Sequence, residues 1–263
     1  MDHQYLTEAF TSPEGLELQR KQYLDSLIEP QELYSELLVH EGKGYSISDN
    51  GVNIGYFIVR EHEIVEFYLS NRYYFAMERI FSQIIQEYSI TGSMVKSFDF
   101  PLMNLSHQFF KNSHPDGYLF RHSLPNEGIH TSPVCDIQRR HCANSDIPVI
   151  LEMSGDFFSG AEELTRIISR EEIFIYEKES ILYGIGLCQR THPNYNWYDI
   201  GMIIHPSFRR IGLGSYIFQD MKQYSIHQGG FPTAGCGCDN HGSRRCIEKS
   251  GFYLGHLFIH FTQ

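Results

Sequence analysis

Residues 205–218 (HPSFRRIGLGSYIF) contain the residue types of an anion-binding turn. Arg209 and Arg210 bring positive charge, and Gly212 and Gly214 precede an apolar-faced helix. Glycine allows backbone conformations and close approaches that a Cβ forbids, so several N–H groups can face one point. The helix N-terminus adds unpaired N–H groups and a partial positive charge, which suit a phosphate or pyrophosphate. A plain strand-to-helix turn, with glycines needed for packing, is the alternative explanation.

The common phosphate-binding motifs differ from this one. A P-loop requires Gly-Lys-Ser/Thr after the glycines, and a dinucleotide fold requires a third glycine where Ile217 stands. What remains is the pattern R-x-x-G-x-G, Arg209 to Gly214, after a strand that ends at Pro206 because proline lacks a backbone donor. This pattern resembles the signature of the GCN5-related N-acetyltransferases (GNAT). Residues 240–252 (NHGSRRCIEKSGF) resemble a second segment of that family, an N-x-x-S stretch followed by Gly-Phe, at the expected distance.

The resemblance covers residues 132–261 and implies both a fold and a cofactor. The implied fold is the acyl-CoA N-acyltransferase fold, an α/β (α+β) arrangement with a mixed central sheet and flanking helices. Acetyl-CoA is expected in a cleft where two adjacent parallel strands separate, with the cofactor arm paired to the first strand like an added strand. For the strand residues, a plain buried strand is compatible with that role. The residues implied in cofactor binding are Met202, Ile203, Ile204, Arg209, Arg210, Ile211, Gly212, Leu213, Gly214, Ser215, Asn240 and Ser243.

Acylation of an amine benefits from a base. An amine with the pKa of lysine, ~10.4, is neutral in only about one molecule per two thousand at pH 7, so a group or water relay that removes its proton assists the reaction. Asp199 is the first candidate, because it lies early in the expected cofactor strand, where members of the family often place a carboxylate. A hydrogen bond to the backbone is its alternative role. His205 has a suitable unperturbed pKa, but we expect it to face solvent or the loop.

The departing thiolate raises the question of an acid. The family often has a tyrosine in the last helix, and Ile247, which cannot donate a proton, stands at the matching position. Tyr253, Cys246 or water could substitute, or no acid is needed, because a thiol with a pKa near ~8.5 is a fair leaving group. A covalent route through Cys236 or Cys238 is less economical than direct transfer.

Composition limits the classes of function. The chain has 263 residues, 41% of them hydrophobic, and a formal net charge of −11, which argues against a nucleic-acid surface and mildly favours cationic small partners. The six cysteines match neither a zinc pattern nor a small disulfide scaffold, so we expect no metal. Neither a run of ~18 to 20 apolar residues nor a signal peptide is evident, which favours a cytoplasmic protein without membrane contact.

The second half of the chain reads as an alternation of strands and helices. Strands are expected at residues 134–140, 197–205, 233–239 and 253–261, with a hairpin over 172–190. Helices are expected at 146–154, 160–169, 214–227 and 242–250.

The first half shows the same order of elements. Helical periodicity over residues 14–38 precedes a hairpin with its turn at Asn50-Gly51, a strand at 63–70, a helix with an apolar stripe at 75–88, a strand at 93–100, a short helix at 103–112 and a strand at 117–123. Residues 124–131 have the composition of a linker. We therefore predict two tandem GNAT-like units, residues 1–125 and 131–263.

The first unit is predicted to have lost the cofactor loop. Its strand-to-helix connection has no glycine, and Tyr73, Tyr74 and Phe75 would block close approach of the backbone to a phosphate. We expect a degenerate domain that shapes an acceptor pocket or covers the second domain's surface.

These observations predict an acetyl-CoA-dependent N-acetyltransferase in which an amine of a small molecule or peptide attacks the thioester directly in a ternary complex. A non-catalytic acyl-CoA sensor or scaffold is the alternative, and hydrolysis or transfer to a hydroxyl is a further option. The acceptor, the acyl chain length and the oligomeric state stay open.

Overall fold

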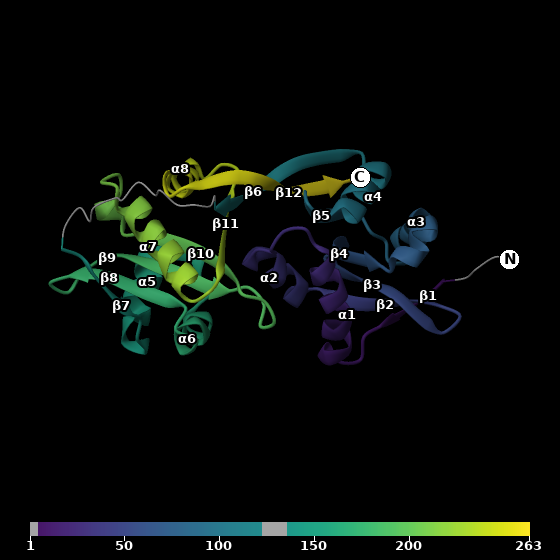
Figure 1. The fold of residues 1–263 in the computed structure, drawn as a ribbon, viewed down its shortest axis with the longest axis horizontal. Helices are drawn as coiled ribbons and strands as arrows, with labels where there is room; N and C mark the ends of the chain where they lie inside the picture. Colours follow the sequence, from purple (N-terminus) through teal and green to yellow (C-terminus); the bar gives the residue numbers. More distant parts are fainter. Residues whose placement is uncertain (1–4, 123–135) are drawn as a thin grey trace. The chain divides into compact units, whose positions relative to one another are not determined.

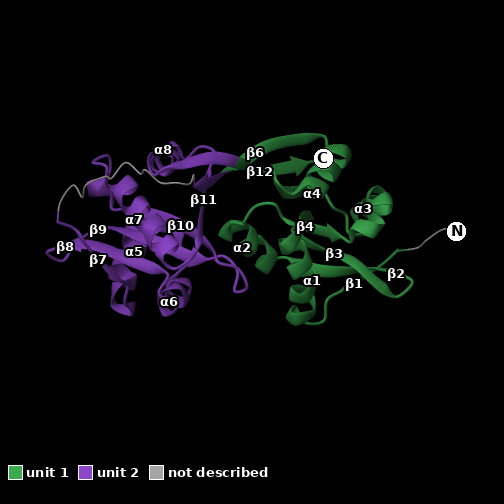
Figure 2. Ribbon diagram, in the orientation of Figure 1, with its two compact units in different colours: residues 1–118, 256–263 green, residues 119–255 purple. Residues whose placement is uncertain are grey.

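The computed structural model describes residues 5–122 and 136–263, and Figure 1 shows its ribbon. The chain divides into two compact units (Figure 2): unit 1 comprises residues 1–118 and 256–263, and unit 2 comprises residues 119–255. Two strands, β6 (Asn112–His122) and β12 (Phe252–Thr262), contribute residues to both units. The linker predicted at 124–131 lies outside the described residues. None of the described helices is long and apolar enough to cross a membrane.

Unit 1 is a mixed sheet with helices, in the strand order β1-β2-β3-β4-β5-β12. Neighbouring strands are antiparallel except β4 and β5, which are parallel. Its further elements are β1 (Tyr5–Ala9), α1 (Pro13–Ser26), α2 (Leu33–Glu41), β2 (Lys43–Asp49), β3 (Val52–Arg60), β4 (Glu63–Leu69), the 3-10 turn η1 (Asn71–Ala76), α3 (Met77–Glu87), β5 (Gly92–Lys96) and α4 (Phe100–Phe109).

Unit 2 has the strand order β6-β11-β10-β9-β8-β7. Strands β7, β8, β9 and β10 pair with one another in an antiparallel way, whereas β10 and β11 are parallel. Its further elements are β7 (Gln138–His141), η2 (Asn144–Asp146), α5 (Ile147–Ser154), η3 (Gly155–Phe157), α6 (Ala161–Ser169), β8 (Ile173–Lys178), β9 (Ile181–Arg190), β10 (Trp197–Ile204), η4 (Pro206–Phe208), α7 (Leu213–His227), β11 (Phe231–Gly237) and α8 (His241–Lys249).

The two units repeat one order of elements, as the sequence predicts. In each, two helices precede an antiparallel hairpin, and a strand, helix, parallel strand, helix and final strand follow. Strands β4 and β5 of unit 1 therefore correspond to β10 and β11 of unit 2. Helices α3 and α4 likewise correspond to α7 and α8.

Local chemistry explains where the elements turn and end. The hairpin turn predicted at Asn50-Gly51 is confirmed, with both residues at positive φ, the geometry of a two-residue hairpin loop. The helical periodicity over residues 14–38 is divided between α1 and α2. Pro30 lies between the two helices, and a proline both lacks the donor that an α-helix needs and disfavours helical backbone in the preceding residue.

Each unit has its own apolar core. In unit 1 the apolar stripe predicted for α3 is buried at Ile80, Phe81 and Ile84, which pack in one cluster with sheet residues such as Phe57 and Phe67. In unit 2 the helices α5 and α6 pack on β8 and β9 through a cluster that includes Ile150, Leu164, Ile167, Ile185 and Leu187. Burial of each large apolar side chain contributes roughly 1.5–3 kcal/mol.

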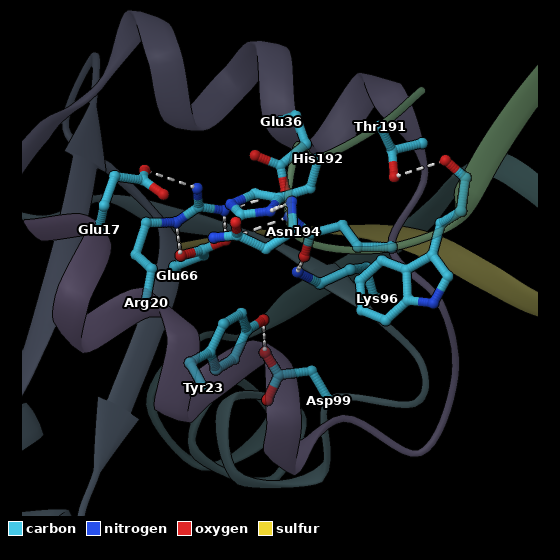
Figure 3. Close-up of polar contacts among 12 residues, drawn as sticks. Glu17, Arg20, Tyr23, Glu36, Glu66, Lys96, Asp99, Thr191, His192 and Asn194 are labelled. Carbon is cyan, nitrogen blue, oxygen red and sulfur yellow. Dashed lines mark hydrogen bonds and ion pairs between the residues drawn. The ribbon is translucent and has the colours of Figure 1, made fainter. Parts of the chain in front are cut away.

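A buried ionic network ties α1 of unit 1 to its sheet (Figure 3). Arg20 of α1 is 2% exposed, and its Nε and Nη2 donate to the two carboxylate oxygens of Glu66 on β4 at 3.0 and 2.9 Å. The Tyr56 hydroxyl also donates to Glu66, at 2.9 Å, and Arg20 donates to Glu36 at 3.0 Å. Burial opposes ionisation of Glu66, but the charge and hydrogen bonds of Arg20 hold its pKa below the ordinary value.

A second part of the network surrounds Lys96 of β5. This lysine is buried, donates to the side chain of Gln31 and lies over the Tyr23 ring at 5.0 Å from the centroid. The Tyr23 hydroxyl donates to Asp99 at 2.6 Å (Figure 3). Asp99 also accepts from the Leu102 N–H and so caps α4, while its burial raises the pKa of its carboxyl. Gln31 Nε2 donates to Glu66 at 3.3 Å and so joins the two parts. Charged side chains from two strands, two helices and the N-cap of a third helix are thus held in one connected set.

Replacement of Arg20 by methionine should destabilise unit 1 strongly, because Glu66 would lose its cation inside the protein. We expect the free energy of unfolding in urea to fall by about 3–5 kcal/mol. Lys21→Met is the matched control: the Lys21 side chain is 58% exposed and pairs with Asp25 on the same helix, so its loss should cost less than about 1 kcal/mol. If both variants lose the same free energy of unfolding, the buried ion pair is not what stabilises unit 1 here.

Candidate functional site

The parallel strands β10 and β11 of unit 2 pair only over their first residues. The register joins Trp197 to Phe231, Tyr198 to Pro232 and Asp199 to Thr233. Among the described residues the pairing ends there, although β10 continues to residue 204 and β11 to residue 237. The two strands therefore part after Asp199 and Thr233, and an edge of β10 is left without a strand partner on that side.

The ladder with β9 fixes which backbone groups of β10 face the gap. The His205 N–H donates to the Tyr183 C=O at 3.0 Å, so the backbone of His205 faces β9. In an antiparallel pair alternate residues exchange these bonds, and Ile203 therefore also faces β9. Met202 and Ile204 direct their N–H and C=O groups to the opposite side, where β11 has parted. Two of the three residues predicted for the cofactor strand thus present backbone to the gap.

The turn after β10 carries the predicted arginines. His205 Nδ1 accepts from the Ser207 N–H at 3.3 Å and shapes the first part of the turn. Arg209 Nε donates to the Ile204 C=O at 3.2 Å, which anchors this exposed guanidinium at the end of β10. Arg210 is also exposed and has a φ of 66°, in the left-handed region that residues with a side chain seldom adopt. Both arginines therefore lie where β10 gives way to α7, and Ile211 beside them is exposed.

Helix α7 begins directly after the turn. Its N-cap residue Gly212 has a φ of 89°, which explains the need for glycine at this position. Glycine has no side-chain oxygen that could accept from the first turn of the helix. Leu213, Gly214 and Ser215, which make up that turn, are buried, and the Tyr216 N–H donates to the Gly212 C=O. The helix N-terminus therefore keeps a partial positive charge that an anion could complement.

The second glycine of the motif has a packing role. A Cβ built on Gly214 would lie 2.8 Å from Cys246 Sγ of α8, closer than real Cβ atoms approach another atom. The two explanations left open by the sequence thus both apply to the turn. Gly212 is required by its backbone conformation, and Gly214 is required by the close contact between α7 and α8.

Helix α8 begins at the second predicted motif. Asn240 is its N-cap residue, and the Asn240 side-chain oxygen accepts from the Ser243 N–H at 3.1 Å. Ile247 is 2% exposed and belongs to the interior, whereas Tyr253 of β12 is 52% exposed. The position at which the family often has a tyrosine is therefore buried in this chain.

Asp199 lies where the two strands separate. It is paired in register with Gln189 of β9 on one side and Thr233 of β11 on the other. The alternation of side chains along a strand places Asp199 on the same face as Ile203, which packs against the α5 and α6 core. The candidate base is thus at the closed end of the gap between β10 and β11.

Cys236 of β11 is a poor nucleophile. Burial, reinforced by the neighbouring Cys238, raises the pKa of Cys236 to about 11. At pH 7 only about one Cys236 in ten thousand is then a thiolate, the form that attacks carbonyl carbon. The described residues hold no group of three or more histidine, cysteine, aspartate or glutamate side chains arranged to bind a metal ion.

In unit 1, the corresponding strands β4 and β5 and the turn η1 carry different residues. The β4–β5 pairing joins Glu63 to Gly92 and Ile64 to Ser93, so Ile64 corresponds to Asp199 as the last paired residue. Two residues further along, Glu66 of the ionic network stands where unit 2 has Gly201. The turn η1 contains no residue of positive φ, and Phe75 within it is 82% exposed.

Lys222 of unit 2 belongs to neither of the two motifs, and its burial was not predicted from the sequence. It is 1% exposed and lies on the buried stripe of α7, whose helical spacing includes Phe218, Met221 and Ser225. That spacing was visible in the sequence and would have placed the lysine inside. Burial lowers the pKa of Lys222 to about 8.

Models of known protein families match both halves of the chain. A family model described as an acetyltransferase (GNAT) domain matches residues 13–123, and one described as the acetyltransferase (GNAT) family matches residues 150–252. No curated protein matches the sequence.

Several solved structures match the chain over almost its whole length. An acetyltransferase of the GNAT family from Colwellia psychrerythraea has a TM-score of 0.87 at 18% identity, covering 98% of this chain and 99% of its own. A GCN5-related N-acetyltransferase from Sphaerobacter thermophilus has a TM-score of 0.64 at 12% identity, with 97% and 94% covered. A tandem GNAT protein from the clavulanic acid biosynthesis pathway has 0.65 at 11% identity, with 99% and 98% covered. The likeness concerns the fold, and it confirms the predicted mixed sheet in tandem units.

A methyl group at Gly214 should destabilise unit 2 through its contact with Cys246. We expect Gly214→Ala to lower the free energy of unfolding by about 1–3 kcal/mol, the usual cost of overpacking. The double variant Gly214→Ala, Cys246→Ala has room for the methyl group and should regain most of that loss in chemical denaturation. If the second substitution restores no stability, the contact with Cys246 is not the reason for this glycine.

Stability should depend on pH through Lys222. Below pH 8 this lysine is charged in both the folded and the unfolded protein, and burial of the charge destabilises the folded state. Between pH 8 and the ordinary value of 10.5 the folded protein loses the proton and the unfolded chain keeps it, so folding becomes relatively more favourable. Lys222→Met should therefore have a higher free energy of unfolding than the natural chain at pH 7. The difference between the two proteins should shrink by roughly 3 kcal/mol as the pH rises to 10.5, because the natural chain gains stability. A difference that does not change with pH in urea titrations would contradict this.

Proposed function

Because the chain belongs to the GNAT acetyltransferase family and carries one such domain in each half, we propose that unit 2 is an acetyl-CoA-dependent N-acetyltransferase. The observation that carries the proposal is the parting of β10 from β11 directly beside the glycine-capped N-terminus of α7. Exposed backbone and a positive helix end suit an extended amide-bearing arm that ends in a pyrophosphate. Acetyl-CoA has both parts.

We assign the two parts of acetyl-CoA to two parts of the site. The pyrophosphate is assigned to the first turn of α7, with Arg209 and Arg210 supplying full positive charges. The pantetheine arm is assigned to the gap, where the backbone of Met202 and Ile204 can pair with it as a neighbouring strand would. This arrangement directs the thioester toward Asp199, at the closed end of the gap.

The proposed reaction is direct attack by an amine of a small molecule or peptide. The nitrogen bonds to the acyl carbon, the bond from that carbon to sulfur breaks, and coenzyme A leaves as the thiolate. Asp199 takes the proton of the amine, directly or through water. The thiolate takes a proton from water, or from Tyr253 or Cys246, because Ile247 has none to give. The raised pKa of Cys236 disfavours a route through a cysteinyl acyl-enzyme.

We propose that unit 1 does not bind acetyl-CoA. Its turn η1 has no glycine, and exposed Tyr74 and Phe75 occupy the place of the arginines and glycines of unit 2. Its strands carry Glu66 and Lys96 beyond the last paired residues, where unit 2 has the backbone edge. One molecule of acetyl-CoA should therefore bind per chain.

A binding function without turnover is the second candidate. It is favoured by Ile247, which is buried and cannot donate a proton at the position where the family often has a tyrosine. The two functions differ in one respect. An N-acetyltransferase releases free thiol only when the acceptor amine is present, whereas a sensor binds acetyl-CoA and releases none.

Loss of Arg209 should weaken acetyl-CoA binding. Arg209→Gln removes a charge-assisted contact worth about 1.5–3 kcal/mol, so the dissociation constant in calorimetry should rise roughly 10- to 100-fold. The natural chain should bind one equivalent. Arg170→Gln is the control, because Arg170 is an exposed arginine at the end of α6 and its loss changes the net charge equally. The assignment of the pyrophosphate is wrong if both variants bind alike.

Loss of the Asp199 carboxylate should slow the chemical step. Asp199→Asn keeps the size of the side chain and removes the base, so thiol release at saturating acetyl-CoA and amine should fall by about 10²- to 10⁴-fold. The dissociation constant for acetyl-CoA should change less than about threefold. A variant with full turnover would show that another group or water alone accepts the proton.

A further inference from the structure

A buried cation links helix α7 to the end of α8. Lys222 Nζ, on α7, donates to the C=O of Ser250, the C-cap residue of α8, at 3.0 Å. The same ammonium lies over the Phe252 ring at 4.9 Å from the centroid. Phe252 in turn packs edge-on against Phe218 of α7, with the ring centroids 5.3 Å apart. One side chain of α7 thus contacts both the end of α8 and the strand that follows it.

Ser250 provides a second link between the helices. Its hydroxyl is 3.2 Å from the C=O of Ser215, in the first turn of α7, and 2.8 Å from the C=O of Cys246 in α8. Cys246 also makes the close contact with Gly214. The start of α7, its middle and the last turn of α8 are therefore joined in one set of contacts, which we call the α7–α8 clamp: Gly214, Ser215, Lys222, Cys246, Ser250 and Phe252.

We propose that Lys222 is a positioning residue for acetyl-CoA binding, which holds α8 at a fixed spacing from the first turn of α7. This inference rests on the proposed function of unit 2. The first turn of α7 is where the pyrophosphate is assigned, and α8 begins with the motif residues Asn240 and Ser243. Because a helix moves as a nearly rigid rod, an anchor at its last turn also fixes its first.

Stability alone does not account for a lysine at this place. Methionine has a similar length and would fill the same space among apolar side chains without a charge to bury. The lowered pKa of Lys222 shows that its charged form is disfavoured there at neutral pH. A buried charged residue where an apolar one would be more stable is expected at positions that support a functional site.

The test compares Lys222→Met with Lys249→Met. Lys249 is an exposed residue in the last turn of α8, so its replacement removes the same charge near the same site without touching the clamp. For Lys222→Met we expect the dissociation constant and KM for acetyl-CoA to rise 5- to 20-fold, with kcat changed less than twofold. Amide hydrogen exchange in residues 241–249 should become faster, while exchange in α5 and α6 stays as in the natural chain. Lys249→Met should match the natural chain in all of these.

The outcomes separate the two proposals. If the natural chain binds no acetyl-CoA, the proposed function fails, and the role of Lys222 fails with it. If the natural chain binds and Lys222→Met binds equally well, the role of Lys222 is overturned and the proposed function stands. Lys222→Gln, whose side chain is too short to reach both Ser250 and Phe252, provides a second variant and should show the same loss of affinity.

Discussion

In each unit two neighbouring parallel strands pair over two or three residues and then part, so the backbone groups that face the gap beyond that point have no partner in the sheet among the described residues. Backbone N–H and C=O groups inside a protein require partners, and a parallel sheet normally supplies them from the next strand. In unit 2 the pairing of β10 with β11 ends at Asp199 and Thr233, although β10 continues to Ile204. The turn and the N-terminus of α7 follow this opened edge of β10, and α8 begins shortly after β11 ends. A ligand with amides and a terminal anion would complete what the sheet leaves unpaired.

The two units carry different residues where their parallel strands part. In unit 1 the strands that part carry Glu66 and Lys96, which belong to an internal network with Arg20. A buried ion pair contributes little net stability over an apolar replacement, but the removal of one partner is costly, so such a network holds one arrangement firmly. In unit 2 the corresponding position is Gly201, and charge is placed instead at the exposed turn, in Arg209 and Arg210. The two copies of the fold thus place their charged side chains differently, inside the unit in unit 1 and at the exposed turn in unit 2.

The sequence was sufficient for the elements that depend on local chemistry. Glycine at 212, proline at 206 and helical spacing after residue 214 identify the turn and α7, because each acts within a few residues. The sequence did not reveal why Gly214 is glycine, since its contact, Cys246, lies on another helix. The return of β12 to pair with β5, as in Phe258 with Lys96, joins distant parts of the chain that no periodicity connects. Arg20 and Glu66 were missed for the same reason.

A crystal structure of the full chain with coenzyme A would test the proposed site most directly. We expect one molecule per chain, with its pyrophosphate at the N-terminus of α7 beside Arg209 and its pantetheine arm hydrogen-bonded to the backbone of Met202 and Ile204. Coenzyme A bound against η1 of unit 1, or away from the gap between β10 and β11, would contradict this expectation.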